Sequence, residues 1–285
     1  GRLTLLLGKY DEAKGYFEKT AVALQSKPEN SQTHRQRAEL CLLMGELHER
    51  QAPPDALTWV QRGLEMVEAS QNRLRCELQI QASSILMHMG NYGGALEQLL
   101  LCLDDLPDQN QPLQIKAYKN LGAVYWHLKE LPLALEYSEK ALVTSRQIKD
   151  HLQTAKTSIN LGPIKYTLGD WDGAISNLEE ALEIAKRLGS HTVILSLHAN
   201  LGRCYLEKGK AQQCRAHLEQ ALRLAKESNA HQAIPARINL ARLHLYAGRY
   251  QEALSVLELA EKDAVAKNDQ LSLTTVHQIQ ANVFL

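Results

Sequence analysis

The tripeptide Asn120-Leu121-Gly122 recurs as Asn160-Leu161-Gly162 and as Asn200-Leu201-Gly202, and a fourth copy reads Asn239-Leu240-Ala241. The spacings between the four asparagines are 40, 40 and 39 residues. A fixed period of this size is typical of a chain in which one supersecondary unit is stacked many times. The sequence therefore predicts a repeat array, in which each unit contacts mainly its neighbours.

Each repeat has the pattern of two helices joined by a short turn. In the clearest copy, Tyr118, Leu121 and Tyr125 recur at helical spacing. Pro132 then suits the first turn of a second helix, because its missing N–H costs nothing there. Small residues such as Gly122 would let the two helices approach closely. The turns of four other repeats carry a glycine that can adopt the positive φ that ends a helix: Gly90, Gly169, Gly209 and Gly248.

The pattern Tyr118-x2-Leu121-Gly122-x2-Tyr125, followed by Ala134, resembles the signature of the tetratricopeptide (TPR) repeat. The resemblance extends over essentially the whole chain. Two features depart from it: the period is longer than the usual ~34 residues, and the closing proline is absent. Repeats of this length are similar to those of bacterial transcription activators of the maltose type, signalling NTPases and peptide-sensing Rap-like regulators.

The resemblance implies an all-α fold, a right-handed superhelical solenoid of antiparallel helix pairs with seven hairpins plus one terminal helix. We expect a single TPR solenoid over residues 1–285. Its approximate repeats are 1–32, 33–72, 73–112, 113–150, 151–190, 191–230, 231–269 and a partial repeat at 270–285. Neither end resembles the polar capping unit that solenoids need, so we expect the chain to be a segment of a longer protein.

Composition excludes several function classes. Lys+Arg and Asp+Glu both number 32, so a zero net charge gives no support for direct binding to nucleic acid or to an anionic membrane. No apolar run approaches the ~18 residues that span a bilayer, and no signal peptide is visible. The odd number of cysteines argues against a disulfide framework and fits a cytoplasmic location. We expect all five to be packing residues: Cys41, Cys76, Cys102, Cys204 and Cys214.

The four asparagines are the first candidates for a binding site. On a helical wheel Asn120 points almost opposite to Leu121, Gly122 and Tyr125, which pack inside the hairpin. The resemblance places this side of the first helices on the concave surface, where a row of carboxamides would hydrogen-bond the main chain of an extended peptide. Two alternatives stay open: the amides hold neighbouring helices together, or solvated asparagines simply persist from duplication.

Side chains beside the asparagines extend this predicted face. Lysines and arginines make it modestly basic, which favours an acidic peptide or a carboxylate terminus. Aromatic residues at one edge would hold apolar side chains, or else pack against the next helix. The predicted ligand-binding residues are Asn120, Asn160, Asn200, Asn239, Gln81, Gln278, Lys116, Lys119, Lys156, Arg203, Arg242, Trp126, His127, Tyr166 and Tyr246.

The carboxylate clamp of chaperone-binding TPR domains is not formed. Lys119 and Asn160 fit two of its five positions, but Ala123, Ser196 and Asn200 occupy the other three. No catalytic or zinc-binding motif stands out either. We therefore expect no enzyme activity, no metal and no cofactor.

The sequence predicts a protein- or peptide-binding TPR module, the interaction or sensor segment of a larger cytoplasmic regulatory protein. Its partner would be a protein, a peptide or another domain of the same parent chain. Two alternatives remain: a structural scaffold that self-associates through its end helices, where Val283-Phe284-Leu285 is apolar, and a domain that senses a small molecule.

Overall fold

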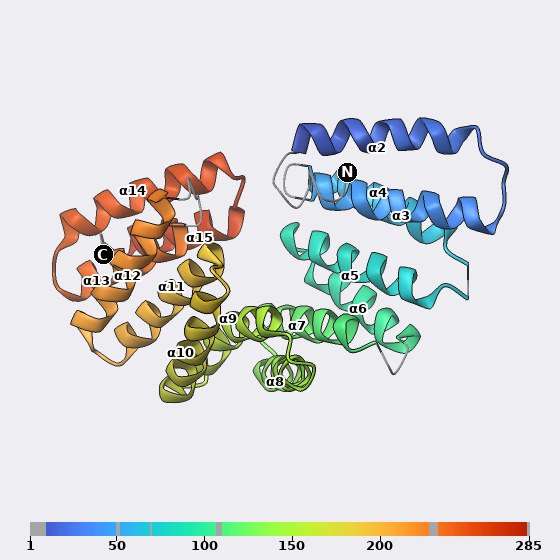
Figure 1. Ribbon diagram of the computed structural model, residues 1–285. Helices are drawn as coiled ribbons and strands as arrows, with labels where there is room; N and C mark the ends of the chain where they lie inside the picture. The colour runs from blue at the N-terminus through green and yellow to red at the C-terminus, as the bar shows by residue number, and fades with distance from the viewer. Residues whose placement is uncertain (1–9, 50–51, 69, 107–109, 228–232, 284–285) are drawn as a thin grey trace. The chain divides into compact units, whose positions relative to one another are not determined.

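The computed structural model describes residues 10–49, 52–68, 70–106, 110–227 and 233–283. Within these residues the chain forms fourteen α-helices and no strand, which confirms the all-α prediction (Figure 1). The helices are α2 (Tyr10–Gln25), α3 (Ser31–His48), α4 (Pro53–Met66), α5 (Asn72–His88), α6 (Tyr92–Asp105), α7 (Gln111–His127), α8 (Leu131–Gln147), α9 (His151–Thr167), α10 (Trp171–Arg187), α11 (His191–Glu207), α12 (Ala211–Glu227), α13 (Ile234–Tyr246), α14 (Tyr250–Ala266) and α15 (Gln270–Ala281).

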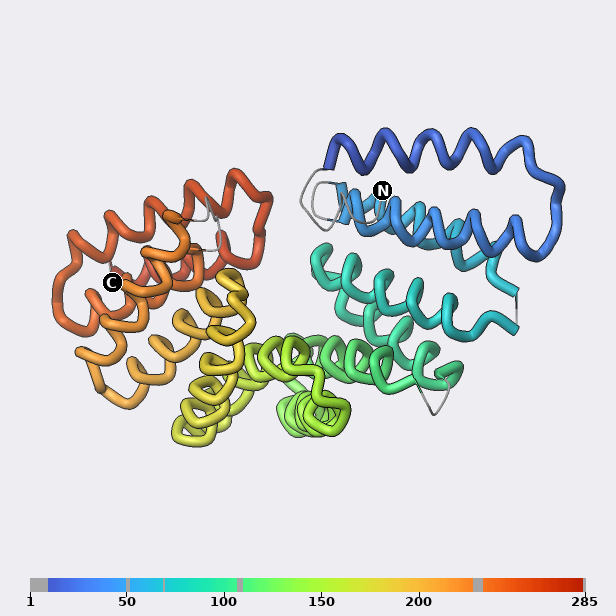
Figure 2. Tube along the Cα trace, viewed as in Figure 1, coloured from blue at the N-terminus to red at the C-terminus, as the bar shows by residue number. Residues whose placement is uncertain are grey.

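The helices group into two compact units, Gly1–Ile148 and Lys149–Leu285. Unit 1 holds the pairs α3–α4, α5–α6 and α7–α8, together with α2. Unit 2 holds α9–α10, α11–α12 and α13–α14, and α15 packs against α14 and α13. Figure 2 follows the Cα trace from helix to helix in chain order. The predicted helix pairs are thus confirmed in each unit, whereas the predicted first helix of the first hairpin lies in residues 1–9, outside the described residues. The single solenoid over the whole chain stays a prediction.

The turn between two paired helices combines a helix stop with a helix start. Gly169 has a φ of 82°, and its N–H donates to the Tyr166 carbonyl while that of Asp170 donates to Lys165, the hydrogen-bond pattern of a Schellman cap. The Asp170 carboxylate then accepts from the N–H of Gly173 at 2.9 Å and caps α10. The predicted positive φ of the turn glycines is therefore confirmed.

Two turns use a lysine where other repeats have glycine. Lys129 and Lys149 adopt φ values of 68° and 57°, which is unusual for residues with a Cβ atom. Gly169 and Gly189 occupy the equivalent positions 40 residues later, with φ values of 82° and 64°. The backbone of the turn is therefore dictated by the repeat, and the lysines follow it at a conformational cost.

Glycines inside the first helices allow the close approach within each pair. A Cβ atom on Gly202 would lie 2.5 Å from Cδ2 of Leu218 on the paired helix α12. At Gly162 the corresponding distance to the Leu178 side chain is 3.1 Å. The prediction that small residues bring the paired helices together is confirmed at these positions.

Successive first helices also contact one another. In unit 1 the chain of contacts runs through α3, α5 and α7, and in unit 2 through α9, α11, α13 and α15. The second helices pack against these elements and bury small and apolar residues at helical spacing, as Ala174, Leu178, Ala181 and Ala185 do in α10. One side of the first helices in each unit is thereby turned toward the neighbouring first helices rather than toward the hairpin core.

All five cysteines are free thiols buried in the core, as expected for packing residues. Burial raises the pKa of Cys41 and Cys214 to about 11 and that of Cys204 to about 12, so these thiols stay protonated and unreactive. None of the helices in the described parts of the chain combines the length and the apolar character that crossing a bilayer requires.

Candidate functional site

Three of the four asparagines donate hydrogen bonds to the preceding first helix. In unit 1, Nδ2 of Asn120 on α7 lies 3.2 Å from both Oγ of Ser83 and Oγ of Ser84 on α5. The Asn120 side chain is buried in this contact. Its amide therefore joins two neighbouring repeats. This contact agrees with the alternative prediction that the asparagines hold neighbouring helices together.

In unit 2 the acceptors are backbone carbonyls. Nδ2 of Asn200 on α11 donates to the carbonyl of Ile159 on α9 at 3.0 Å. Nδ2 of Asn239 on α13 donates to the carbonyl of Ala199 on α11 at 3.3 Å. Each bond spans one repeat, so the same residue type bridges successive first helices twice.

The remaining amides of the predicted row are placed differently. Asn160 is half-buried on α9, and its carboxamide has no hydrogen-bond partner within the described residues. Gln81 on α5 is buried against Gly45, and both of its amide atoms lack a partner in the same set of residues. Gln278 is exposed on α15. Contact between these amides and a ligand stays a prediction.

The predicted basic residues of unit 1 lie on α7. Lys116 is exposed and Lys119 is half-buried. At the end of the same helix, the ring of His127 stacks on Tyr92 with centroids 4.4 Å apart, and Trp126 meets His127 edge-on at 4.8 Å. Burial, followed by the charge of Lys129, lowers the pKa of His127, so this ring is neutral and packs as an aromatic residue.

In unit 2 the structure brings several predicted residues together on the side that α9, α11 and α13 share. The guanidinium of Arg203 lies over the ring of Tyr166, with Cζ 5.5 Å from the ring centroid. Nη2 of Arg203 also pairs with the carboxylate of Glu207 one turn later. Arg242 on α13 follows in the next repeat: its Nη1 lies 3.5 Å from Oδ1 of Asn239, and Asn239 in turn bonds the Ala199 carbonyl on α11. Burial, followed by the charge of Arg203, lowers the pKa of Arg242.

Within the described residues, one edge of this surface is exposed. Tyr246, at the end of α13, is 71% exposed, whereas Lys156 on α9 is half-buried. We call the surface the unit 2 face and define it by Lys156, Asn160, Tyr166, Arg203, Glu207, Arg242 and Tyr246. It combines amide and guanidinium groups that can donate hydrogen bonds with aromatic rings.

A histidine pair in unit 2 was not identified from sequence. Nδ1 of His198 on α11 and Nδ1 of His217 on α12 are 2.9 Å apart, so one ring donates and the other accepts. Tyr205 stacks on His217 with centroids 5.3 Å apart, and its hydroxyl donates to Glu179 at 2.8 Å. The two histidines belong to different helices, so no spacing within one helix signals their contact.

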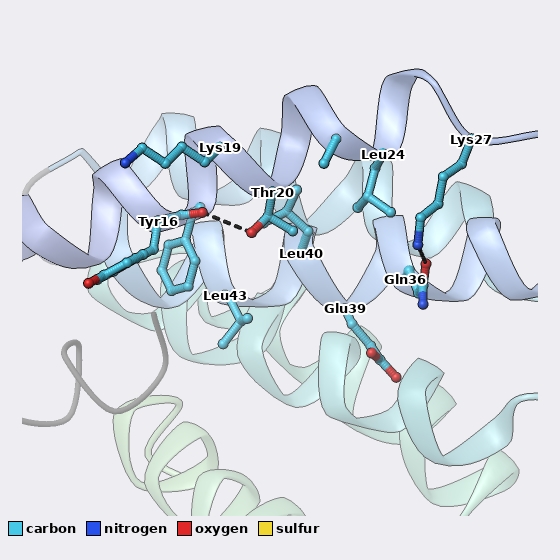
Figure 3. A pocket seen from close by; sticks show the side chains of 11 residues that line it. Tyr16, Lys19, Thr20, Leu24, Lys27, Gln36, Glu39, Leu40 and Leu43 are labelled. Atoms are coloured by element: carbon cyan, nitrogen blue, oxygen red, sulfur yellow. Dashed lines mark hydrogen bonds between the residues drawn. The ribbon is translucent and has the colours of Figure 1, made fainter.

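A cavity of 620 Å³ lies between α2 and α3 in unit 1 (Figure 3). Phe17, Leu24 and Leu40 line it together with polar side chains. Two of these polar side chains form hydrogen bonds with nearby residues: Lys27 Nζ donates to Gln36 at 2.9 Å, and the Thr20 hydroxyl donates to the Tyr16 carbonyl of its own helix. The cavity contains none of the predicted binding residues. Across the described ranges, no group of three or more His, Cys, Asp and Glu side chains could hold a metal ion.

Comparisons with known proteins agree with this architecture. The profile of the MalT-like TPR region matches residues 76–285. No curated protein matches the sequence significantly. The structure is similar to a Rap protein complexed with competence and sporulation factor, with a TM-score of 0.77, 17% identity, and coverage of 97% of this chain and 81% of that chain.

Two further solved structures share the fold. NprR in complex with its cognate peptide NprX has a TM-score of 0.74 and 16% identity, and the match covers 100% of this chain and 84% of that chain. A signal transduction ATPase with a tetratricopeptide repeat sensor, from Pyrococcus horikoshii, has a TM-score of 0.63 and 15% identity over 89% of this chain and 40% of that chain. At these identities the likeness concerns the fold of antiparallel helix pairs.

Proposed function

Because the chain belongs to the MalT-like TPR family, we propose that it is a protein- or peptide-binding module that acts as the interaction or sensor segment of a larger cytoplasmic regulatory protein. Its partner is a peptide, a protein or another domain of the same parent chain, and the proposal assigns the module no catalytic step. Structures of the same fold include a Rap protein bound to a factor, NprR bound to a peptide and a sensor of a signalling ATPase, which supports this class of function.

The observation that carries the proposal is the composition of the unit 2 face. It presents a tyrosine that is 71% exposed, Tyr246, beside the half-buried arginines Arg203 and Arg242. Tyrosine and arginine are the residue types enriched at protein interfaces and among the residues that dominate binding energy. Two of the asparagines, Asn200 and Asn239, are used for contacts between repeats, so the residues beside them supply most of the recognition.

Selection of short random peptides on the full chain tests this function, followed by affinity measurements with variants. Tyr246→Ala removes an exposed ring from the unit 2 face and should weaken the selected peptides about 10-fold or more. Tyr250→Ala is the matched control, because Tyr250 is also an exposed tyrosine of unit 2 but starts the second helix α14. It should leave the affinity unchanged.

The outcome depends on where the peptides bind. Loss of binding in Tyr246→Ala and in Lys156→Ala, with the melting temperature retained, places the partner on the unit 2 face. Peptides that respond only to Tyr250→Ala would overturn the unit 2 face as the binding surface. A chain that selects no peptide at all would overturn the peptide-binding function.

A further inference from the structure

Arg203 and Arg242 occupy the same position in successive repeats, three residues after Asn200 and Asn239. We propose that these two arginines form one site that receives a carboxylate group of the bound peptide or protein, an inference that rests on the proposed function. The carboxylate belongs either to an acidic side chain or to the C-terminus of the partner.

The hydrogen-bonding capacity of Arg203 is only partly used. Its Nη2 atom pairs with Glu207, but Nε and Nη1 are buried and have no partner within the described residues. A buried donor that lacks an acceptor has lost its hydrogen bonds to water without replacement, which is unfavourable. An added acceptor would therefore be favourable at this position even before its charge is considered.

The charges around Arg203 and Arg242 also favour binding of an anion. Burial and the nearby charge of Arg203 both lower the pKa of Arg242, and Glu207 is the one carboxylate among the groups that influence it. Arg203 and Arg242 together carry two positive charges, and Glu207, which pairs with Arg203, carries one negative charge, so these three groups have an excess of one positive charge. A carboxylate carries one negative charge and would balance the cluster, whereas a phosphate dianion would reverse its sign.

The side chain of Arg203 is partly exposed, although two of its nitrogens are buried. Tyr166 lies against a face of the guanidinium, with Cζ 5.5 Å from the ring centroid, so the N–H groups at the rim of the guanidinium remain for acceptors. The side chains of Arg203 and Glu207 are 18% and 24% exposed, which places the pair at the surface of the unit 2 face. Arg242 Nη1 is 3.5 Å from Oδ1 of Asn239, a weak contact that a ligand can replace.

The test uses the tightest peptide selected on the full chain, made with each carboxylate neutralised in turn. Asp→Asn and Glu→Gln changes address side chains, and a C-terminal amide addresses the terminus. Neutralising one of these groups should weaken binding to the wild-type chain about 10-fold or more. The same change should have little effect on Arg242→Gln or Arg203→Gln, because these variants have already lost the partner of that carboxylate.

Arg223→Gln is the control, since Arg223 is an exposed arginine on the second helix α12 and its loss changes the net charge equally. Arg242→Gln should keep or raise the melting temperature, because it relieves repulsion between like charges. A purely structural arginine would lower it. Peptides that need Tyr246 but tolerate neutralisation of every carboxylate would overturn the carboxylate site and leave the proposed function standing. Equal losses in Arg242→Gln and Arg223→Gln would also overturn it.

Discussion

The amide of Asn200 donates to the backbone carbonyl of Ile159 at 3.0 Å, one repeat earlier in the chain. In an α-helix that carbonyl would accept from the N–H four residues later, but residue 163 is a proline and has no N–H. Helix α9 nevertheless runs unbroken from His151 to Thr167. Asn200 therefore supplies, from the next repeat, the donor that Pro163 removes.

The first prediction concerns this compensation. Asn200→Ala should destabilise the protein by about 1–3 kcal/mol, because it leaves the Ile159 carbonyl without its donor. In a Pro163→Ala background the helix regains its own N–H, and the cost of Asn200→Ala should fall below about 1 kcal/mol. Chemical denaturation of the four proteins measures this coupling.

Asn239→Ala is the control for that cycle. Its acceptor, the Ala199 carbonyl, lies in α11 where Arg203 supplies the usual N–H, so its cost should not depend on Pro163. If Asn200→Ala costs the same in both backgrounds, the compensation does not contribute to stability.

A second prediction addresses the close approach of paired helices. Gly202→Ala should cost about 1–3 kcal/mol, because the new Cβ would lie 2.5 Å from Leu218. Gly15→Ala should instead stabilise by about 0.5–1 kcal/mol, since Gly15 is inside α2 and nothing lies within 4 Å of the place that its new methyl group would occupy. Thermal unfolding of both variants checks the opposite signs, and a loss of stability in both would contradict this account.

The helix pairs could be predicted from sequence because their signals are local. The apolar spacing around Leu121, the proline that opens α8 and the glycine at position 169 each describe a few adjacent residues. The same signals recur at a fixed period, so a repeat with a weak pattern can be assigned from its register with the clear ones.

The candidate site could be predicted only in part. The helical wheel gives the direction of an asparagine but not its depth, so it could not show that Asn120 is buried against Ser83. The pairing of Asn200 with Ile159 depends on a proline one repeat earlier, and the contact of His198 with His217 joins two helices. These contacts depend on how the helices pack against one another, and the repeat period of the sequence carries no information about that packing.

The third prediction concerns the strained turn at Lys149. Lys149→Gly should stabilise the protein by about 0.5–1 kcal/mol. A positive φ costs a lysine about 1–2 kcal/mol, and the greater conformational entropy of glycine in the unfolded chain offsets only part of the gain from removing this cost. Gly189→Ala puts a Cβ atom into the equivalent turn 40 residues later and should therefore destabilise it. No atom lies within 4 Å of a Cβ at Gly189, so its cost would be purely conformational. Unchanged stability in both variants would contradict the strain.

The last prediction uses the histidine pair between α11 and α12. Burial, followed by the neighbouring charges of His217, Lys186 and Arg223, lowers the pKa of His198 to about 4, and burial also lowers that of His217 despite the carboxylate of Glu179. In the unfolded chain His198 takes up a proton near its ordinary pKa of 6.5, whereas in the folded chain it does so only near pH 4. The free energy of unfolding should therefore fall as the pH drops from 6.5 toward 4. The largest slope for one such group is about 1.4 kcal/mol per pH unit.

His198→Asn removes the titrating ring and keeps an amide that can donate to Nδ1 of His217. Its stability should therefore depend less on pH than that of the wild type over the same range, which urea denaturation at a series of pH values would measure. His191→Asn is the matched control, because His191 is an exposed residue at the start of the same helix. If the His198→Asn and wild-type curves run parallel from pH 6.5 to 4, the pair does not couple protonation to folding.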